Sequence, residues 1–556
     1  MSVFRRLLSK RQPDPSGRRW LFVPYDQLSD NMGPLSREDP RTLGIVLVEN
    51  TWKAARRPYH KQKLGLILTN LRHFALEQAE RGVAVRHVVA NAPYRTALKQ
   101  LGPELGSIRV MMPAERELRV DLQPLVDAGG LEFISHEGWL TTSEQFGRSA
   151  KKAPPWRMDA FYRYVRRDTG ILMEKGKPVG GKLSFDVENR LAWRGDPPAP
   201  EVPTFPVDPI KREVVELIES RLNHHPGQLD LHRIPGTKSD AQQLWSWAKS
   251  KCLPNFGPYQ DAMSKGSSSL FHTRISALLN IHRLLPVDIM DDVLGIDLPL
   301  PSKEGFIRQV LGWREFVHHV HVATDGFRNL PSGDPSIVSL PGDGGYARWA
   351  GKPWPHKSLG DHPDGGAKPS FLGGANPLPP AYWGEKSGLN CLDQIVSDVW
   401  NEGYGHHITR LMVLANLATL LEVSPRELTD WFWVAYADAY DWVVEPNVLG
   451  MGTFATGDLM TTKPYVAGAA YINRMGDYCE TCLFDPKGNC PIADLYWAFL
   501  ARHESLLKSN PRLRMIMATL RKRKASLRSR DEVVFHTVRN GLMEGLLLSP
   551  RDLPGR

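Results

Sequence analysis

Four of the five cysteines in this chain could act together, and this possibility constrains the fold more than any other feature. Cys479, Cys482 and Cys490 lie in the short run YCETCLFDPKGNCP, and Cys391 lies far upstream in SGLNCLDQ. Thiolates hold iron–sulfur clusters, and a C-x2-C pair places two sulfurs on one face of a cluster within a single backbone turn. The same four thiolates could form a tetrahedral zinc site. Scattered core cysteines are a third alternative, so the spacing alone does not choose the metal.

Length and composition describe a globular protein with more than one domain. At 556 residues the chain is too long for one hydrophobic core, so two domains with connections are expected. No apolar run reaches the roughly 18 residues needed to span a bilayer, and the basic N-terminus lacks the apolar core of a secretory signal. So few cysteines argue against a disulfide scaffold and favour a reducing cytoplasm. The net charge of +9 permits a polyanionic partner such as nucleic acid without requiring one.

The first part of the chain alternates strand-like and helix-like segments. Short apolar runs of strand length occur in RRWLFVPYDQL, GIVLVEN, VAVRHVVAN and IRVMMPA, and the segment HKQKLGLILTNLRHFALEQAERG has the apolar spacing of a helix. This alternation predicts a parallel α/β sheet covered on both faces, over residues 19–145. No G-x-G-x-x-G follows the first strand, so the usual dinucleotide fingerprint is missing from this domain.

The rest of the chain divides into a connector and a helical domain. Residues 146–225 are rich in proline, glycine and charge, which predicts an extended linker over the surface. Residues 226–556 are predicted to be helical, with a long glycine- and proline-rich interruption at 331–388 that is either functional or a flexible insertion. The basic run LRKRKASLRSR near 520–530 has a solvated helix face as its simplest interpretation.

Several polar motifs in the helical part could form a site, although each also has a purely structural explanation. FHTRIS is predicted to begin a helix whose polar residues suit a phosphate, or serve only as a cap. GWREF offers an Arg–Glu pair that could be structural. GHHITR places adjacent histidines on a helix, where one can face a cavity while the other packs. WFWVAYADAYDWVVEPN is dense in aromatic residues, which suits a core or a planar cofactor.

At these motifs the sequence resembles a known family, the bacterial iron–sulfur branch of the photolyase and cryptochrome proteins associated with (6-4) photoproducts. The resemblance extends from YDQLS at Tyr25 to LYWAFLARHE at Glu504. It includes YHKQKLGLILTNLRHFA, RMDAFYRYVRRDTGILMEKGKPVGGKLSFDVENR, GHHITRLMVLANLATLL, DWVVEPNVLGMGTFATGD and TKPYVAGAAYINRMGDYCETC. It implies an N-terminal Rossmann-like antenna domain, a linker, and an all-helical domain that binds folded FAD and a [4Fe-4S] cluster.

The resemblance also implies roles for individual residues. The expected FAD contacts are His272, Thr273, Arg274, Ser276, Arg314, Arg410, Asp438 and Asn447. The lesion pocket would be formed by His406, His407 and Tyr465, with one histidine as proton donor. Electron transfer to the flavin would use Trp431 and Trp383. The cluster ligands would be Cys391, Cys479, Cys482 and Cys490. The antenna would be 6,7-dimethyl-8-ribityllumazine, with Glu49 as one contact.

The implied function is a light-driven DNA repair lyase, in which reduced FAD donates an electron to a flipped-out (6-4) photoproduct. UV-damaged DNA is then the partner, no membrane is involved, and a monomer is expected. One alternative is a cryptochrome-like blue-light photoreceptor with the same cofactors and no repair activity. Another is a light-independent DNA-binding protein with a vestigial site. The paired histidines and the tyrosine favour repair.

Overall fold

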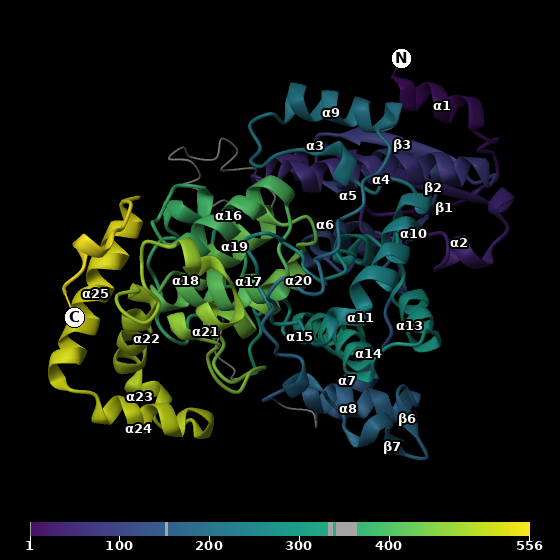
Figure 1. Ribbon diagram of the computed structural model, residues 1–556. Coiled ribbons are helices and arrows are strands. Elements are labelled where there is room, and N and C mark those ends of the chain that lie inside the picture. Colours follow the sequence, from purple (N-terminus) through teal and green to yellow (C-terminus); the bar gives the residue numbers. More distant parts are fainter. Residues whose placement is uncertain (1, 151–153, 332–336, 341–363, 556) are drawn as a thin grey trace.

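The N-terminal part of the protein forms a five-stranded parallel sheet. The structure is a computed structural model that describes residues 2–150, 154–331, 337–340 and 364–555. The strands follow the order β3-β2-β1-β4-β5 and neighbouring strands are parallel throughout; Figure 1 labels β1, β2 and β3. Their bounds are β1 (Arg19–Phe22), β2 (Leu43–Asn50), β3 (Ala84–Ala90), β4 (Ile108–Met111) and β5 (Leu131–Ile134). The predicted parallel α/β fold is confirmed, and β5 is an addition to the four predicted strands.

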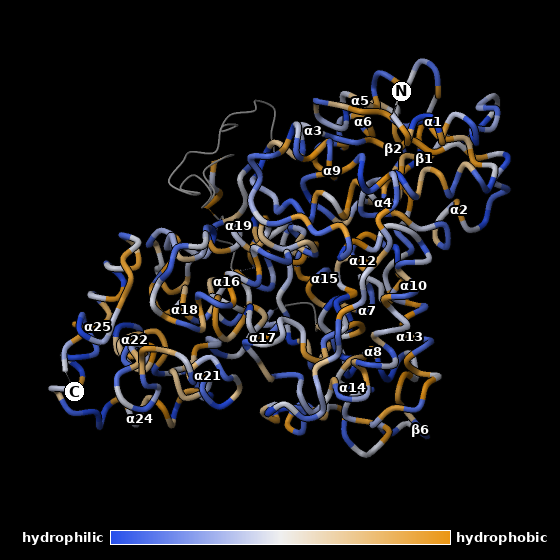
Figure 2. The backbone as a smooth tube through the Cα atoms, turned by 45° about the horizontal axis from the view of Figure 1, so that its top comes forward, coloured by the Kyte–Doolittle hydropathy of each residue, from blue (hydrophilic) through white to orange (hydrophobic). Residues whose placement is uncertain are grey.

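Burial explains why these segments form strands. All eight residues of β2 are buried, as expected for a strand covered on both faces. Helices α4 (Lys61–Glu80), α5 (Tyr94–Leu105) and α6 (Arg116–Asp127) follow β2, β3 and β4 as crossover connections. In Figure 2 the strands β1 and β2 are coloured mainly as hydrophobic, whereas the outer helices alternate between the two colours. The sheet is therefore an interior layer, and its edge at the strand carboxyl ends faces the rest of the chain.

The predicted extended linker over 146–225 is wrong for much of its length. This segment contains the end of α7 (Ser143–Ser149), then α8 (Met158–Thr169), a short hairpin of β6 (Met173–Glu174) and β7 (Lys177–Pro178), and α9 (Pro209–Arg221). Phe161, Tyr162 and Val165 of α8 are buried, and α9 packs against α4 and the N-terminal helix α1 (Val3–Arg11). The prolines and glycines that suggested a linker lie between these helices, where they interrupt the chain without preventing helix formation.

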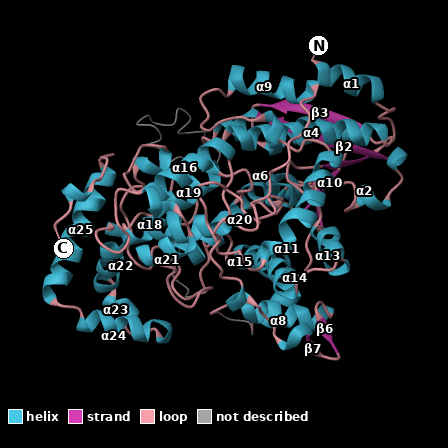
Figure 3. Ribbon diagram, in the orientation of Figure 1, coloured by secondary structure: helices cyan, strands magenta, loops and turns pink. Residues whose placement is uncertain are grey.

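The second half is helical, as predicted (Figure 3). The helices that follow α9 are α10 (Lys238–Trp247), α11 (Leu253–Phe256), α12 (Ser276–Asn280), α13 (Pro286–Gly295), α14 (Leu300–Ile307), α15 (Glu315–Ala323), α16 (Asn390–Glu402), α17 (His407–Thr409), α18 (Asn416–Leu420), α19 (Pro425–Ala435), α20 (Asp441–Glu445), α21 (Ala469–Met475), α22 (Pro491–Arg502), α23 (Glu504–Leu507), α24 (Arg514–Lys522) and α25 (Ala525–Met543). The 331–388 interruption lies partly outside the described residues. Among those described, no helix is long and apolar enough to cross a membrane.

Buried polar contacts join the sheet to the helical domain. The backbone N–H of Glu117 donates to Asp441 Oδ2 at 3.2 Å, and Glu117 also pairs with Arg57. Lys63, on α4, donates from Nζ to the carbonyl oxygens of Trp433 (3.1 Å) and Ala439. Because unpaired buried polar groups are costly, these bonds hold the two parts in one arrangement.

Candidate functional site

A cavity of about 270 Å³ lies among the helices, and it collects residues from four separate segments of the chain. Nine of the residues proposed above for cofactor and lesion contacts line it, namely His272, Thr273, Arg274, Ser276, His406, His407, Arg410, Asp438 and Asn447. The sequence separation between the first and last of these is far larger than one helix. The clustering therefore comes from the tertiary fold, and their individual roles remain predictions.

A buried ion pair lies on one side of this cavity. Arg410 contacts Asp438 through both guanidinium nitrogens, with Nη1–Oδ1 at 3.0 Å and Nη2–Oδ2 at 2.9 Å. Arg410 also donates from Nε to the Gly405 carbonyl at 2.6 Å, and Ser276 Oγ donates to Asp438 at 2.7 Å. Burial acts to raise the pKa of Asp438, but attraction to Arg410 and these hydrogen bonds outweigh burial and lower it. The carboxylate is therefore ionised at neutral pH and holds the guanidinium in a fixed plane.

The FHTRIS segment forms a strained turn before a short helix. Helix α12 begins at Ser276, so His272, Thr273 and Arg274 precede it and do not form its first turn. Arg274 has a φ of 56°, a left-handed conformation that is uncommon for residues other than glycine. Its guanidinium contacts Glu402 at 2.7 Å and lies 3.9 Å from the centroid of the Tyr404 ring. The predicted helix start is thus wrong by several residues, and the turn is what directs Arg274 towards the cavity.

A second cavity of about 70 Å³ shares four lining residues with the first. These shared residues are Arg274, Ser276, Tyr404 and Asp438. The two cavities therefore adjoin across a polar boundary. An elongated ligand with a planar part and an anionic part could extend from one into the other, with Arg274 near its middle.

The two adjacent histidines differ in their surroundings. His406 is buried, stacks on His272 with ring centroids 4.4 Å apart, and has no hydrogen-bond partner for either ring nitrogen among the described residues. His407 is the first residue of α17 and is solvent-exposed where it lines the cavity. Loss of hydration against the surrounding protein, and then the positive charges of Arg410 and Arg308, lower the pKa of His407 to about 4. The Asp186 carboxylate acts in the opposite direction. Both imidazoles are therefore neutral at neutral pH, and His407 is the one a large substrate can reach.

Tyr465 does not line the cavity itself. Its side chain is half-buried, and burial together with the nearby Asp159 and Asp186 carboxylates raises its pKa. Asp186 also acts on His407. The Asp186 carboxylate therefore acts on the pKa of both Tyr465 and His407, the two residues proposed for the lesion pocket.

Arg314 is not among the residues that line the cavity. Its guanidinium lies 4.3 Å from the Trp139 ring centroid and 5.3 Å from that of Trp442, and it pairs with Glu315 at 3.2 Å. Glu315 in turn accepts hydrogen bonds from Leu140 N–H and Thr141 N–H. The geometry thus supports the structural explanation of the Arg–Glu pair in GWREF rather than a flavin contact.

Three tryptophans form a continuous path, and sequence reasoning identified only two of them. Trp400 stacks on Trp383 with centroids 5.4 Å apart and meets Trp431 edge-on at 6.1 Å. Trp400 and Trp431 both donate from Nε1 to the Tyr382 carbonyl, at 2.9 and 2.8 Å. Trp431 is fully buried and packs on Phe432, which lines the cavity. Trp400 lies on α16 with no motif around it, so only the fold reveals its position between the other two.

Two of the nine proposed site residues in this cavity lie in π-helical turns, which are rare and frequently occur at functional sites. Arg410 begins the π-turn Arg410–Ala415, and Asn447 lies in the π-turn Pro446–Gly452. Periodicity in a sequence does not predict such turns, because one extra residue is inserted without any change of composition. Each turn rotates the residues around it relative to a regular α-helix, which places both side chains towards the cavity.

The four cysteines of the predicted cluster meet in one small apolar cavity. Cys391 is near the start of α16, Cys490 caps α22, and Cys479 and Cys482 lie in the turn between α21 and α22. Burial and then the three other thiols raise the pKa of Cys391 well above its usual value. All five cysteines are free, and Cys252 lies apart from the set. Among the described residues, no three Cys, His, Asp or Glu side chains are placed to hold a single metal ion.

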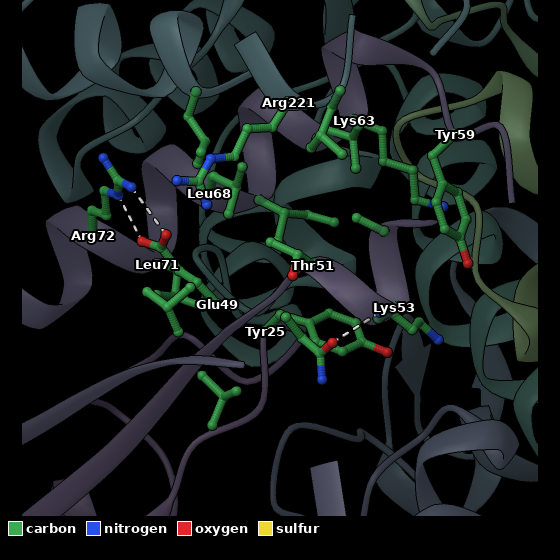
Figure 4. Close-up of a pocket in the computed structure, with 18 of the residues that line it drawn as sticks. Tyr25, Glu49, Thr51, Lys53, Tyr59, Lys63, Leu68, Leu71, Arg72 and Arg221 are labelled. Carbon is green, nitrogen blue, oxygen red and sulfur yellow. Dashed lines mark hydrogen bonds and ion pairs between the residues drawn. The ribbon is translucent and has the colours of Figure 1, made fainter. Parts of the chain in front are cut away.

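A separate cavity of about 310 Å³ lies between the α/β domain and the helical domain. Glu49 lines it, but both carboxylate oxygens are held by Arg72 at 2.6 and 2.9 Å (Figure 4). Burial acts to raise the pKa of Glu49, whereas the hydrogen bonds from Arg72 and His87 lower it to about 2. Tyr25 and Tyr440 also line this cavity, and their buried hydroxyls have no partner among the described residues. These two hydroxyls, missed in the sequence, offer more free bonding capacity than Glu49.

The sequence of this chain is similar to a known protein family and to two known proteins. A family model described as deoxyribodipyrimidine photo-lyase-related protein matches residues 21–233. A protein named (6-4) photolyase from Agrobacterium fabrum is 34% identical over 514 residues, which cover 89% of this chain and 94% of that one. An uncharacterized protein of Acanthamoeba polyphaga mimivirus is 30% identical over 102 residues, covering 18% of this chain and 80% of its own.

Two solved structures have the same fold at low sequence identity. A bacterial class III photolyase from Agrobacterium tumefaciens gives a TM-score of 0.53 at 13% identity and covers 95% of this chain and 99% of its own. A Synechocystis cryptochrome gives 0.52 at 14% identity and covers 95% and 98%. Together with the long match to the Agrobacterium fabrum protein, these findings show that the chain belongs to the photolyase/cryptochrome family, in the branch of the (6-4) photolyase.

Proposed function

We propose that this protein is a light-driven DNA lyase that repairs (6-4) pyrimidine–pyrimidone photoproducts. The observation that carries the proposal is the cavity in which His406 and His407 face the same space as the Arg410–Asp438 ion pair. A redox cofactor that only senses light needs no titratable group at its substrate side. The 34% identity to a (6-4) photolyase over most of both chains supports the same activity.

The residues of the cavity fit FAD, the cofactor of the family. Arg274 and the hydroxyl of Ser276 lie at the boundary of the two adjoining cavities, where a diphosphate would find a cation and a donor. Arg410, Asp438 and Asn447 offer donors and acceptors to the planar ring system, and Phe432 offers an apolar face. A bound, reduced flavin excited by blue light supplies an electron to a damaged base. The side chains supply the binding, the orientation and the proton.

His407 and Tyr465 are the groups that meet the lesion. A damaged dinucleotide must be flipped out of the duplex, at an unstacking cost of a few kcal/mol, before it can enter the cavity. In the free protein His407 is neutral, because its pKa is about 4. DNA phosphates at the cavity mouth would raise that pKa, since negative charge favours the imidazolium. His407 would thus gain its proton when the substrate binds and donate it to the hydroxyl that moves between the two pyrimidines.

The three tryptophans give a route by which an electron from the surface reaches the cavity. Trp383 is partly exposed, Trp400 bridges, and Trp431 is fully buried behind Phe432. The Phe432 ring is not redox-active, so the electron would pass from Trp431 to the cofactor without residing on Phe432. This route would serve to keep the cofactor reduced between repair events.

We infer that Cys391, Cys479, Cys482 and Cys490 hold a [4Fe-4S] cluster. All four line the same cavity, and the pKa of Cys391 responds to the three others. Four thiols that meet in one cavity are the ligand set that such a cluster would need. This cavity shares no lining residue with the one at His407, which favours a structural or redox-tuning role.

The cavity between the two domains would hold the antenna, for which we propose 6,7-dimethyl-8-ribityllumazine. Its walls combine aromatic rings (Tyr25, Tyr440 and Trp433) with the amino groups of Lys53 and Lys63. The free hydroxyls of Tyr25 and Tyr440 suit a hydroxylated chain or a heterocyclic carbonyl. Glu49 would act indirectly, because it fixes Arg72 at the edge of the cavity.

The remaining proposals concern partners and setting. UV-damaged DNA is the proposed partner and a monomer the proposed state. A cytoplasmic location is proposed because the chain has only five cysteines and none of those described forms a disulfide. A cryptochrome-like photoreceptor is the second candidate, because the same fold is shared with the Synechocystis cryptochrome.

Repair of defined lesions separates the two candidates. Duplexes that carry one (6-4) photoproduct, one cyclobutane dimer or no lesion are illuminated with the reduced, flavin-loaded protein, and restored bases are counted by chromatography. We expect restoration of the (6-4) duplex alone, in the light alone. No restoration of any duplex by flavin-loaded protein would contradict the lyase and leave the photoreceptor.

A further inference from the structure

A group of exposed cations covers the C-terminal corner of the helical domain. We call it the basic shoulder, and it consists of Lys508, Arg512, Arg514, Lys522 and Lys524. Each is exposed, and none forms an ion pair with a carboxylate of the described residues. The buried stripe of α24 is Met517 and Leu520, so Arg514 and Lys522 occupy its outer side. These charges are therefore not used to stabilise the fold.

The neighbouring arginines show that exposure here is selective. Arg523 pairs with Asp531 at 2.6 Å, Arg530 contacts Asp494 at 3.4 Å, and Arg528 donates to the Leu520 carbonyl at 2.5 Å. Arg521 contacts Glu504 at 3.4 Å. The basic run of the sequence thus contains two classes of residue, one that ties α24 and α25 to each other or to α22 and α23, and one that faces solvent. The prediction of a solvated helix face does not account for the arginines that pair. It also gives no function to the cations that face solvent.

The shoulder adjoins the rim of the proposed lesion pocket. Asn510, in the turn between α23 and α24, donates from Nδ2 to the Thr462 carbonyl at 2.9 Å. Thr462 is followed by the exposed Lys463 and then, two residues on, by Tyr465. In Figure 1, α23 and α24 lie along the same lower edge of the protein as α8, whose first turn follows Arg157. Arg157 donates to the Asp458 carbonyl at 2.8 Å, which joins that side of the rim to the same loop.

We propose that the basic shoulder binds the phosphate backbone of double-stranded DNA on one side of the lesion only. The proposal rests on the proposed repair function, because it takes the rim at Tyr465 as the point where the damaged bases enter. Arg514 and Lys522 are eight residues apart on a helix, which is about 12 Å. One DNA strand carries a phosphate roughly every 3.4 Å of its axis, so this span matches about three or four phosphates. Such contacts position the duplex and carry no sequence information, as a repair enzyme requires.

Duplexes of different lengths test the proposal with matched charge variants. One variant neutralises part of the shoulder with Lys508→Gln, Arg512→Gln and Arg514→Gln. Its control removes the same charge from exposed positions of the α/β domain and of the helices α1 and α9 beside it, with Lys10→Gln, Lys99→Gln and Arg212→Gln. Affinity is measured by fluorescence anisotropy, between 50 and 200 mM salt, on (6-4) duplexes extended on the 5′ side, the 3′ side, both or neither. Flavin absorbance and the repair yield of a minimal duplex show that each variant is intact.

The expected result is asymmetric. The shoulder variant should lose about tenfold or more in affinity at 50 mM salt for duplexes extended on one side. Its slope of log affinity against log salt should be shallower by about 2 to 3, near 0.9 for each lost phosphate contact. The minimal duplex, and the control variant on every duplex, should behave like wild type. Equal losses on both flanks, or losses equal to those of the control, would overturn the proposal.

Two further outcomes separate this proposal from the repair function and from another partner. If no duplex is repaired but the one-sided salt effect remains, the repair function fails and the shoulder stands as a DNA contact. Vesicles of phosphatidylserine and phosphatidylcholine provide the other comparison. Binding of wild type to these vesicles that the shoulder variant loses, with DNA affinity unchanged, would assign the shoulder to a membrane surface and refute the DNA contact.

Discussion

The Arg410–Asp438 ion pair makes the sharpest prediction, because one substitution separates its charge from its shape. Asp438→Asn keeps the side chain's size but removes the charge that faces Arg410 at 2.9 Å. Breaking a buried pair by removing one partner costs about 3–5 kcal/mol, because the other charge stays buried. The Arg410 side chain is 20% exposed and keeps its bond to the Gly405 carbonyl and its place over the Tyr436 ring. The expected loss is therefore at the lower end, about 3 kcal/mol.

The pH dependence gives this prediction a second readout. The pKa of Asp438 is lowered in the folded protein from its ordinary value of 3.8. A lowered carboxyl pKa contributes stability above the unfolded-state pKa, and that contribution is lost as the pH falls through the folded-state value. The difference between wild type and Asp438→Asn should hence be constant from pH 5 to 8 and shrink only in acid below 3.8.

Urea unfolding of the flavin-free protein, followed by circular dichroism, measures both quantities. Glu144→Gln is the matched control, because it breaks an exposed ion pair in which Arg148 and Glu144 are 62% and 71% accessible. That change should cost less than about 0.5 kcal/mol. Flavin retention on desalting should fall for Asp438→Asn alone. A variant that unfolds within about 0.5 kcal/mol of wild type and keeps its flavin would refute the role given to this pair.

Four other substitutions address the remaining parts of the proposed function. His407→Ala should abolish (6-4) repair with FAD retained, and loss of flavin instead would show that His407 supports the cofactor. Cys391→Ala should lose iron, sulfide and absorbance near 400 nm and lower expression, whereas Cys252→Ala should keep the iron. Trp400→Phe should slow light-driven reduction of oxidised flavin at least tenfold while a fully reduced sample still repairs; an unchanged reduction rate would remove Trp400 from the route. Lys63→Met should remove a rise in stability between pH 7 and 10, because burial lowers the pKa of Lys63 and the unfolded state then binds more protons.

The local pattern of apolar residues was enough to predict the parallel sheet. The local composition of residues 146–225 did not predict the helices that this segment forms. The four apolar runs form strands because each is short and packs into the core, as in β2 with its eight buried residues. Residues 146–225 were misjudged because proline and glycine dominate their average composition. Helix α8 forms nonetheless, since Phe161 and Val165 find a buried surface that only the tertiary fold provides. Strand β5 is as long as β1 and β4, but only Leu131 of its four residues is buried, so its core pattern is the weakest of the five strands.

The candidate site was predictable residue by residue where a motif surrounds it. The family resemblance predicted nine of the positions that line one cavity. Arg314 does not line this cavity; the motif GWREF alone does not indicate which way its side chain points, and its flavin contact stays a prediction. The π-turn Arg308–Arg314 ends at that residue, and its guanidinium lies over Trp139 and Trp442. The role of Trp400 could not be predicted from the sequence. It depends on the distances from its ring to Trp383 and Trp431, and no local sequence pattern indicates them.

The aromatic segment 432–440 forms part of the wall of both the proposed flavin cavity and the cavity between the domains. It therefore fixes the position of one cavity relative to the other. Phe432 and Asp438 line the proposed flavin cavity, while Trp433 and Tyr440 line the cavity between the domains. Lys63 fixes this wall from the α/β side through the carbonyls of Trp433 and Ala439. A buried amine held by two carbonyls cannot shift without leaving polar groups unpaired, which costs roughly 1–3 kcal/mol each. The separation of the two cavities is therefore set by backbone contacts, and a change of side chain in either cavity should leave the other in place.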